Sequence, residues 1–143
     1  MLVQLVRHNG IDEIIEVLRS DLAVEIAIAL DWESERCRFE QLEVTGEECY
    51  APCIAFTNDC GRTFEFGPVT HEAFWITYRY LAIQSNFGFT AVEQEIEQML
   101  KDASLDFVVE LLKLHYAGEH RTIAKKLPQK NAFDDMGEQS DES

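Results

Sequence analysis

The sequence is poor in proline and glycine, has no long apolar run and contains few basic residues. With three prolines, seven glycines and 46% hydrophobic residues among 143, it does not fit a collagen, a coiled coil, a disordered chain or a small disulfide scaffold. No apolar run approaches the roughly 20 residues that a membrane helix needs. The apolar start ends at Arg7, too early for the hydrophobic region of a secretory signal. We therefore expect a soluble cytoplasmic protein.

The shortage of basic residues gives the chain a strong negative charge. Twelve Lys and Arg stand against 27 Asp and Glu, for a net charge of −15, which disfavours direct binding to nucleic acid or to an anionic membrane. Residues 1–117 carry −13, residues 118–130 carry +3 and residues 131–143 carry −5. We predict a single α+β domain over residues 1–130 and an acidic disordered tail over 131–143. The basic segment is expected to pair with the tail or with the acidic body.

Common catalytic and metal-binding motifs are absent. The chain has no His-Glu-x-x-His, no Gly-x-Ser-x-Gly and no glycine-rich phosphate loop. Cys49, Cys53 and Cys60 precede His71, but extended chain would separate the first two by roughly 13 Å, whereas zinc holds each thiolate at about 2.3 Å. We predict no metal, no cofactor and scattered free thiols.

Apolar periodicity in the first half indicates a helix followed by strands. Residues 11–20 show helical spacing, with isoleucines and a leucine three and four positions apart. Residues 22–32 alternate apolar and other side chains, which favours a strand, although the alanines there also fit a continued helix. Residues 36–44, 50–57 and 62–66 are predicted as three more strands, with a hairpin loop at 58–61. Together the strands would form a four-stranded antiparallel meander.

The second half is predicted to be helical. Residues 73–85 are apolar almost all round, which indicates a buried helix. Thr90 and Glu93 match a capping box for a helix over 90–103, and helices are expected over 104–116 and 119–127. The predicted architecture is α+β: an N-terminal helix, a four-stranded antiparallel meander and three to four packed C-terminal helices. Helices that are apolar on more than one face make a homodimer plausible.

Acidic side chains crowd one predicted helix and supply the candidate partner-binding residues. These are Glu93, Glu95, Glu97 and Asp102, with Lys101 as the only nearby base. We expect a non-catalytic acidic binding protein, an inhibitor, immunity factor or adaptor, that engages a basic protein partner. Mimicry of nucleic acid is the extreme form of this hypothesis. The association should be sensitive to salt, and charge reversal of the three glutamates should abolish it.

Aromatic residues support an alternative of a different class, a small enzyme or ligand-binding domain with an aromatic-walled pocket. The wall would come from Phe74, Trp75, Tyr78, Tyr80, Phe87 and Phe89. His71 and Glu72, or Cys60, would supply its polar groups. A hydrophobic core explains the same aromatics more simply, because a sheet needs a helix laid across it.

Overall fold

Six antiparallel strands and four helices build the fold in the computed structural model, which describes residues 1–10, 12–86 and 90–128. The strands are β1 (Leu2–Val6), β2 (Asp12–Glu16), β3 (Cys53–Thr57), β4 (Thr63–Pro68), β5 (Phe74–Asn86) and β6 (Thr90–Ala103). The helices are α1 (Ser20–Ala29), α2 (Trp32–Thr45), α3 (Leu105–Tyr116) and α4 (His120–Lys126). The sheet order is β2-β1-β3-β4-β5-β6, with α1 and α2 inserted before β3 returns to pair with β1.

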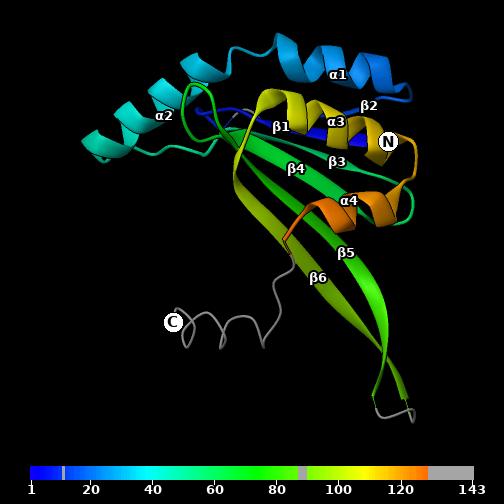
Figure 1. Cartoon of the computed structure of the whole chain (residues 1–143). Helices are drawn as coiled ribbons and strands as arrows, with labels where there is room; N and C mark the ends of the chain where they lie inside the picture. Colours follow the sequence, from blue (N-terminus) through cyan, green and yellow to red (C-terminus); the bar gives the residue numbers. More distant parts are fainter. Residues whose placement is uncertain (11, 87–89, 129–143) are drawn as a thin grey trace.

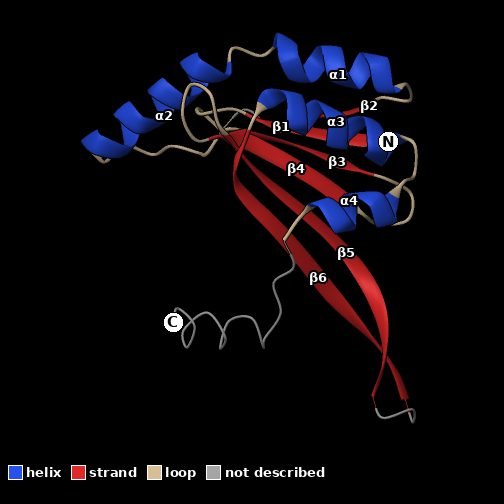
Figure 2. Ribbon diagram, viewed as in Figure 1, coloured by secondary structure: helices blue, strands red, loops and turns tan. Residues whose placement is uncertain are grey.

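The hydrophobic core lies between one face of this sheet and the helices. The strand register places buried Phe56, Phe64 and Tyr78 side by side across β3, β4 and β5. Against them pack residues from every helix, namely Ala23, Ala27, Trp32, Val108, Leu111, Leu112 and Ile123. The molecule therefore has two layers, and the helices lie on the same side of the sheet (Figures 1 and 2).

Local signals explain where two of the helices begin and end. The side chain of Asp31 accepts the N–H of Ser34 at the start of α2, and Gly46 ends that helix with a left-handed φ of 77°. Ser104 caps α3 in the same way, through the N–H of Phe107. Each cap satisfies backbone groups that the helix itself cannot.

The opposite face of the sheet carries a mixed set of side chains. Arg79 on β5 forms ion pairs there with Glu65 at 3.1 Å and with Glu97 at 3.8 Å. Trp75 lies against Gly67, where an added Cβ would meet the Trp75 ring at 2.7 Å and the Pro52 carbonyl at 2.5 Å. The strand therefore needs glycine at position 67 for close approach.

Strands β5 and β6 form a long hairpin that extends beyond the rest of the sheet (Figure 1). Pairing with β4 ends at Arg79, while pairing with β6 continues to Asn86. Leu81 and Ile83 on this extension are 60% and 75% exposed. The hairpin thus leaves apolar side chains outside the core.

The predicted N-terminal helix and four-stranded meander are wrong, because the chain begins with strands and the sheet has six of them. Residues 11–20, predicted as a helix, contain β2, and residues 22–32 and 36–44, predicted as strands, lie mainly in α1 and α2. In α1 the buried residues Ala23 and Ala27 are four positions apart, which places them on one face of the helix. In α2, Arg36 pairs with Glu33 at 2.7 Å and Glu40 at 2.8 Å, three and four residues away.

Two predicted C-terminal helices are also wrong, because residues 73–85 and 90–103 form β5 and β6. Residues 74–83 carry apolar side chains on both sheet faces, interrupted by Thr77 and Arg79 on one of them, and this density of apolar residues resembles a buried helix. Pairing between the two strands overrides the capping-box signal at Thr90. The strands predicted at 50–57 and 62–66 and the helices predicted at 104–116 and 119–127 are confirmed within a few residues. The predicted tail at 131–143 lies outside the described residues.

Candidate functional site

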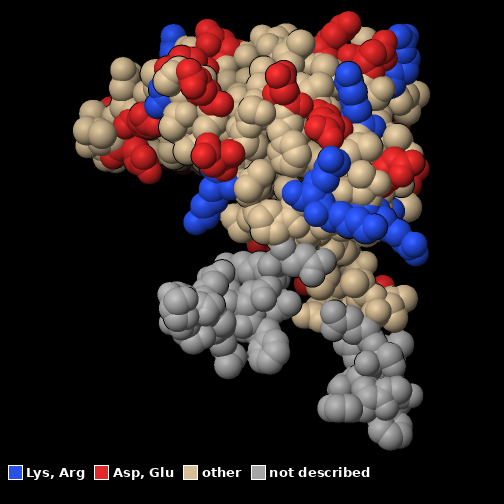
Figure 3. Space-filling model, in the orientation of Figure 1, with Lys and Arg blue, Asp and Glu red and all other residues tan. Residues whose placement is uncertain are grey.

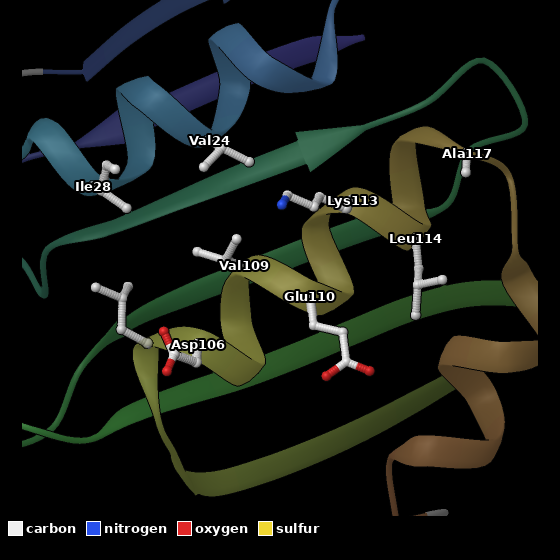
Figure 4. A pocket seen from close by; sticks show the side chains of 9 residues that line it. Val24, Ile28, Asp106, Val109, Glu110, Lys113, Leu114 and Ala117 are labelled. Carbon is white, nitrogen blue, oxygen red and sulfur yellow. The ribbon is translucent and has the colours of Figure 1, made fainter.

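A wide apolar groove of about 830 Å³ lies between α1 and α3. Figure 4 shows Val24 and Ile28 of α1 and Val109 of α3 pointing into the space between the two helices. Leu105, Leu114 and Ala117 extend the apolar lining along α3. Ile28 is half exposed, so the helices contact each other without closing the surface between them.

The sequence of α1 explains why the groove exists. Two of its alanines, Ala23 and Ala27, face the core, whereas Val24 and Ile28 follow them on the neighbouring stripe of the helix. A helix that buries alanines can sit close to the sheet, and its larger side chains are then left toward α3. The groove is therefore a consequence of which residues α1 places inward.

Charged side chains surround the groove. Asp106, Glu110 and Lys113 of α3 line it, and Glu110 is also paired with Lys126 of α4 at 3.1 Å. Figure 3 shows acidic side chains around α1 and α2, whereas basic side chains gather over α4. Arg121, Lys125 and Lys126 supply the basic charge on α4.

The four acidic residues predicted to bind a partner are all exposed, but they lie on an edge strand rather than a helix. Glu93, Glu95 and Glu97 alternate along β6, opposite Ile83, Leu81 and Arg79 of β5. Strand alternation puts the three on one face about 7 Å apart. Charged residues on an exposed edge also prevent sheets from joining edge to edge. These three glutamates can therefore also protect the edge of the sheet.

The row is not uniform. Glu97 is engaged by Arg79, which leaves Glu93 and Glu95 as the more available carboxylates. Asp102 lies next to Lys101 at an irregularity in the register between β5 and β6, and the regular alternation does not carry over to it. The structure therefore brings three of the four predicted residues together.

The polar residues of the alternative hypothesis do not converge. His71 and Glu72 contact each other at 3.2 Å in the exposed turn between β4 and β5. Cys60 is exposed in the turn at the other end of β4. The six residues of β4 separate the two turns by about 20 Å.

The predicted aromatic wall belongs largely to the core. Phe74, Tyr78 and Tyr80 are buried, Trp75 is half-buried on the opposite sheet face, and Phe87 and Phe89 lie outside the described residues. Cys53 lies on β3, where burial and the nearby Glu65 raise the pKa of its thiol to about 12. Within the described ranges, no group of three His, Cys, Asp or Glu side chains could hold a metal ion.

A sealed cluster of polar groups joins α3 and α4 to the sheet. Gln98 is fully buried; its amide donates to the carbonyls of Ala124 and Leu127 at 2.9 Å, and its oxygen accepts the Tyr80 hydroxyl at 2.8 Å. His115 donates from Nε2 to the Phe56 carbonyl at 2.9 Å. Burial lowers the pKa of His115 to about 4, so its ring is neutral at pH 7. We call Tyr80, Gln98 and His115 the C-terminal polar cluster.

A second polar cluster lies at an open hollow of about 530 Å³, where the turn after β1 meets the first turns of α2. Glu35 is 8% exposed, and its Oε1 accepts both the backbone N–H of His8 at 2.9 Å and the ring Nδ1 at 2.8 Å. Burial raises the pKa of Glu35, but these hydrogen bonds and the charge of Arg7 outweigh it and hold the pKa below its usual value. We call His8, Glu35 and Arg7 the N-terminal polar cluster.

Sequence reasoning missed both hollows. The groove depends on α1, whose residues alternate as a strand would. The pair of His8 and Glu35 joins residues 27 positions apart, and no local pattern marks it. Only the i, i+4 spacing of Ala23 and Ala27 beside that of Val24 and Ile28 could have indicated the groove.

Comparison of the chain with family models, curated proteins and solved structures found no match. Among the described residues, no helix has both the length and the apolar character needed to cross a membrane. The function must therefore be inferred from the surfaces themselves.

Proposed function

We propose that this protein is a non-catalytic binding protein, of the inhibitor, immunity or adaptor kind, whose groove between α1 and α3 takes the apolar side of a basic amphipathic helix from a protein partner. The observation that carries the proposal is the open apolar groove between two helices of an acidic molecule. We also propose that it acts in the cytoplasm, where its four free cysteines would stay reduced.

The dimensions of the groove fit a helix. The 10 residues of α1 and 12 residues of α3 give walls about 15 and 18 Å long, which match three turns of a partner. Apolar side chains at i, i+3 and i+4 of such a helix would fill the space between Val24, Ile28 and Val109. Burial of exposed Ile28 would add apolar area to the interface.

Charge favours a basic partner over a second copy of the chain. Two copies would each bring a net charge of −15, and their repulsion opposes association. A basic helix gains from the same field and associates faster at low salt. Glu93, Glu95 and Glu97 add to this field from β6, and in the proposal they attract the partner rather than contact it.

The test uses a synthetic 15-residue peptide with leucines at helical spacing and lysines elsewhere, and a second peptide with glutamates in place of the lysines. Binding is measured by fluorescence anisotropy in 0.15 M salt. The lysine peptide should bind and the glutamate peptide should not. The variant Ile28→Asp should weaken binding at least about tenfold, because it puts a carboxylate against apolar side chains.

The matched control is Val44→Asp, at an exposed position on α2. Both variants make the chain more acidic by one charge, so attraction by charge alone predicts equal or tighter binding for both. Loss of peptide binding in Ile28→Asp alone supports the groove as the binding site. Equal binding by the two variants, with loss on reversal of the three β6 glutamates to lysine, would move the partner to β6 and contradict the groove.

Sedimentation of the protein without peptide completes the test. The proposal expects a monomer with an open groove. A dimer that Ile28→Asp dissociates would show that a second copy fills the groove, and it would contradict a basic partner there.

A further inference from the structure

The N-terminal polar cluster has an arrangement that the proposed binding function does not use. His8 lines the hollow at the start of α2, and its side chain is only 14% exposed. Because Nδ1 is committed to Glu35 at 2.8 Å, Nε2 is the ring nitrogen through which His8 can meet a ligand. A carboxylate behind a histidine fixes the orientation of the ring.

Two arginines line the same hollow as His8. Arg7 reaches Glu35 through one nitrogen at a long 3.6 Å, so most of its donors remain available. Arg38 also lines the hollow, and it forms no ion pair with any residue that the structure describes. Arg7 comes from the end of β1 and Arg38 from the second turn of α2, so the donors come from separate segments.

The carboxylates at the hollow are mostly engaged. Glu35 accepts two hydrogen bonds from His8, and Asp31 accepts the N–H of Ser34 at 3.1 Å. Glu13 is the exposed exception, with no ion pair in the described part of the chain. The three carboxylates keep their charge, so a ligand is held by the donors of Arg7, Arg38 and His8 in a hollow that also carries negative charge.

We propose that this hollow binds a small tetrahedral oxyanion of the phosphate class, held by the guanidinium groups of Arg7 and Arg38 and by Nε2 of His8. Phosphate offers oxygens to donors from several directions, whereas a carboxylate offers two in one plane. When the ring is protonated both nitrogens donate, so Nε2 can donate to a phosphate oxygen while Nδ1 donates to Glu35. Glu35 then balances the imidazolium charge.

The negative charge of the whole molecule does not prevent this binding. At 0.15 M ionic strength, charges more than about 8 Å away are largely screened, so the groups at the hollow decide the affinity. The basic surface of α4 is the competing location, since Arg121 and Lys125 line a smaller hollow of about 380 Å³ together with His120.

The experiment follows the ring signals of the four histidines by NMR, at fixed pH and constant ionic strength, as sodium chloride is replaced by sodium phosphate. The signals of His8 should move and saturate, while those of His120 and exposed His71 move little. Acetate in place of phosphate should move His8 weakly. The ligand could be a phosphate monoester or the free phosphate ion, and glycerol phosphate distinguishes the two. Tighter binding than inorganic phosphate indicates a monoester, and weaker binding indicates the free ion.

Two exposed substitutions at the hollow should act in opposite directions. Arg38→Gln removes an unpaired donor and should weaken phosphate binding about fivefold or more. Glu13→Gln removes the unpaired carboxylate and should tighten it about twofold. Neither position is buried, so the melting temperature should stay within a degree or two, and Arg121→Gln on α4 should leave the His8 response unchanged.

Several results would overturn the proposal. One is a phosphate response at His120 without one at His8. Another is a non-saturating drift of the exposed histidines, which indicates a general salt effect. A third is an Arg38→Gln variant with unchanged affinity, and a fourth is acetate binding as tightly as phosphate.

Discussion

The two polar clusters use similar chemistry in opposite surroundings. Each contains a histidine that hydrogen-bonds to an oxygen acceptor: His115 to the Phe56 carbonyl at 2.9 Å and His8 to the Glu35 carboxylate at 2.8 Å. His115 is 2% exposed between α3 and the sheet, whereas His8 lines an open hollow. The C-terminal cluster is closed to solvent, and the N-terminal cluster is not.

The acceptor decides what each histidine can do. A neutral carbonyl in a buried site leaves His115 uncharged, so its role is to satisfy the backbone of β3 and fix α3. The carboxylate of Glu35 fixes the ring of His8 at the edge of an open hollow and leaves its other ring nitrogen for a ligand. The difference indicates that the C-terminal cluster contributes stability and the N-terminal cluster contributes binding.

The largest expected effect is in the C-terminal cluster. Gln98→Leu keeps a similar volume but leaves the carbonyls of Ala124 and Leu127 and the Tyr80 hydroxyl without their partner. We expect a loss of about 3 to 4 kcal/mol in the free energy of unfolding. Urea unfolding measures it, with exposed Gln94→Leu on the same strand as the control, for which we expect about 0.5 kcal/mol or less. An equal effect of the two variants would mean that Gln98 is not a sealed structural anchor.

The next effect separates the two clusters by pH. The pKa of His115 is lowered to about 4 from about 6.5 in the unfolded chain, so the unfolded state binds the proton first. The contribution of neutral His115 to the free energy of unfolding is fully present above pH 6.5. It falls by on the order of 3 kcal/mol as the pH is lowered toward 4. Unfolding free energies measured between pH 7 and 4 should fall less steeply for His115→Gln. Parallel curves would show that His115 does not titrate as a buried neutral group.

The sequence predicts the regular parts of this fold better than either cluster. The residues at 58–61 predict the β3–β4 hairpin because Asn and Gly tolerate left-handed backbone, and Gly61 does adopt a φ of 80°. Ser104 and the apolar stripe after it predict α3 in the same local way. By contrast, β5 and β6 look helical until they are paired with each other, because residues 74–83 carry apolar side chains on both faces and Thr90 with Glu93 matches a capping box.

The candidate sites were less predictable still. Glu93, Glu95 and Glu97 are evident from composition, but the meaning of their spacing changes with the element: on a helix they would spread around the axis, and on a strand they align. Gln98 looks like an ordinary polar residue among them, although it is fully buried. Its role depends on α4, about 26 residues later, and tertiary contacts of that range leave no local signal.

A smaller stability effect is expected in the N-terminal cluster. Glu35→Gln removes the charge that Arg7 and the ring of His8 engage, and we expect a loss of about 1 to 2 kcal/mol at pH 7. The pKa of Glu35 is lowered, so its contribution is present above about pH 4.3, the usual value for an unfolded glutamate, and is lost as pH falls through the folded pKa. The difference between wild type and variant should therefore begin to shrink only below about pH 4.3, a lower window than that of His115. Curves that stay parallel as pH falls to 3 would show that the charge of Glu35 does not stabilise the fold in this way.

The smallest stability effect is expected at Arg7, and there the comparison between stability and binding is sharpest. Its contact with Glu35 is 3.6 Å long and its side chain is 38% exposed, so Arg7→Gln should cost about 0.5 kcal/mol or less in unfolding free energy. The same substitution should weaken phosphate binding about fivefold, since a guanidinium close to the anion is lost. Arg19→Gln, at an exposed pair with Asp21, should change neither quantity appreciably. Arg7→Gln could instead lower stability as much as Gln98→Leu and leave phosphate binding intact. The N-terminal cluster would then be a structural anchor like the C-terminal cluster, and its exposure to solvent would make no difference to the role of its histidine.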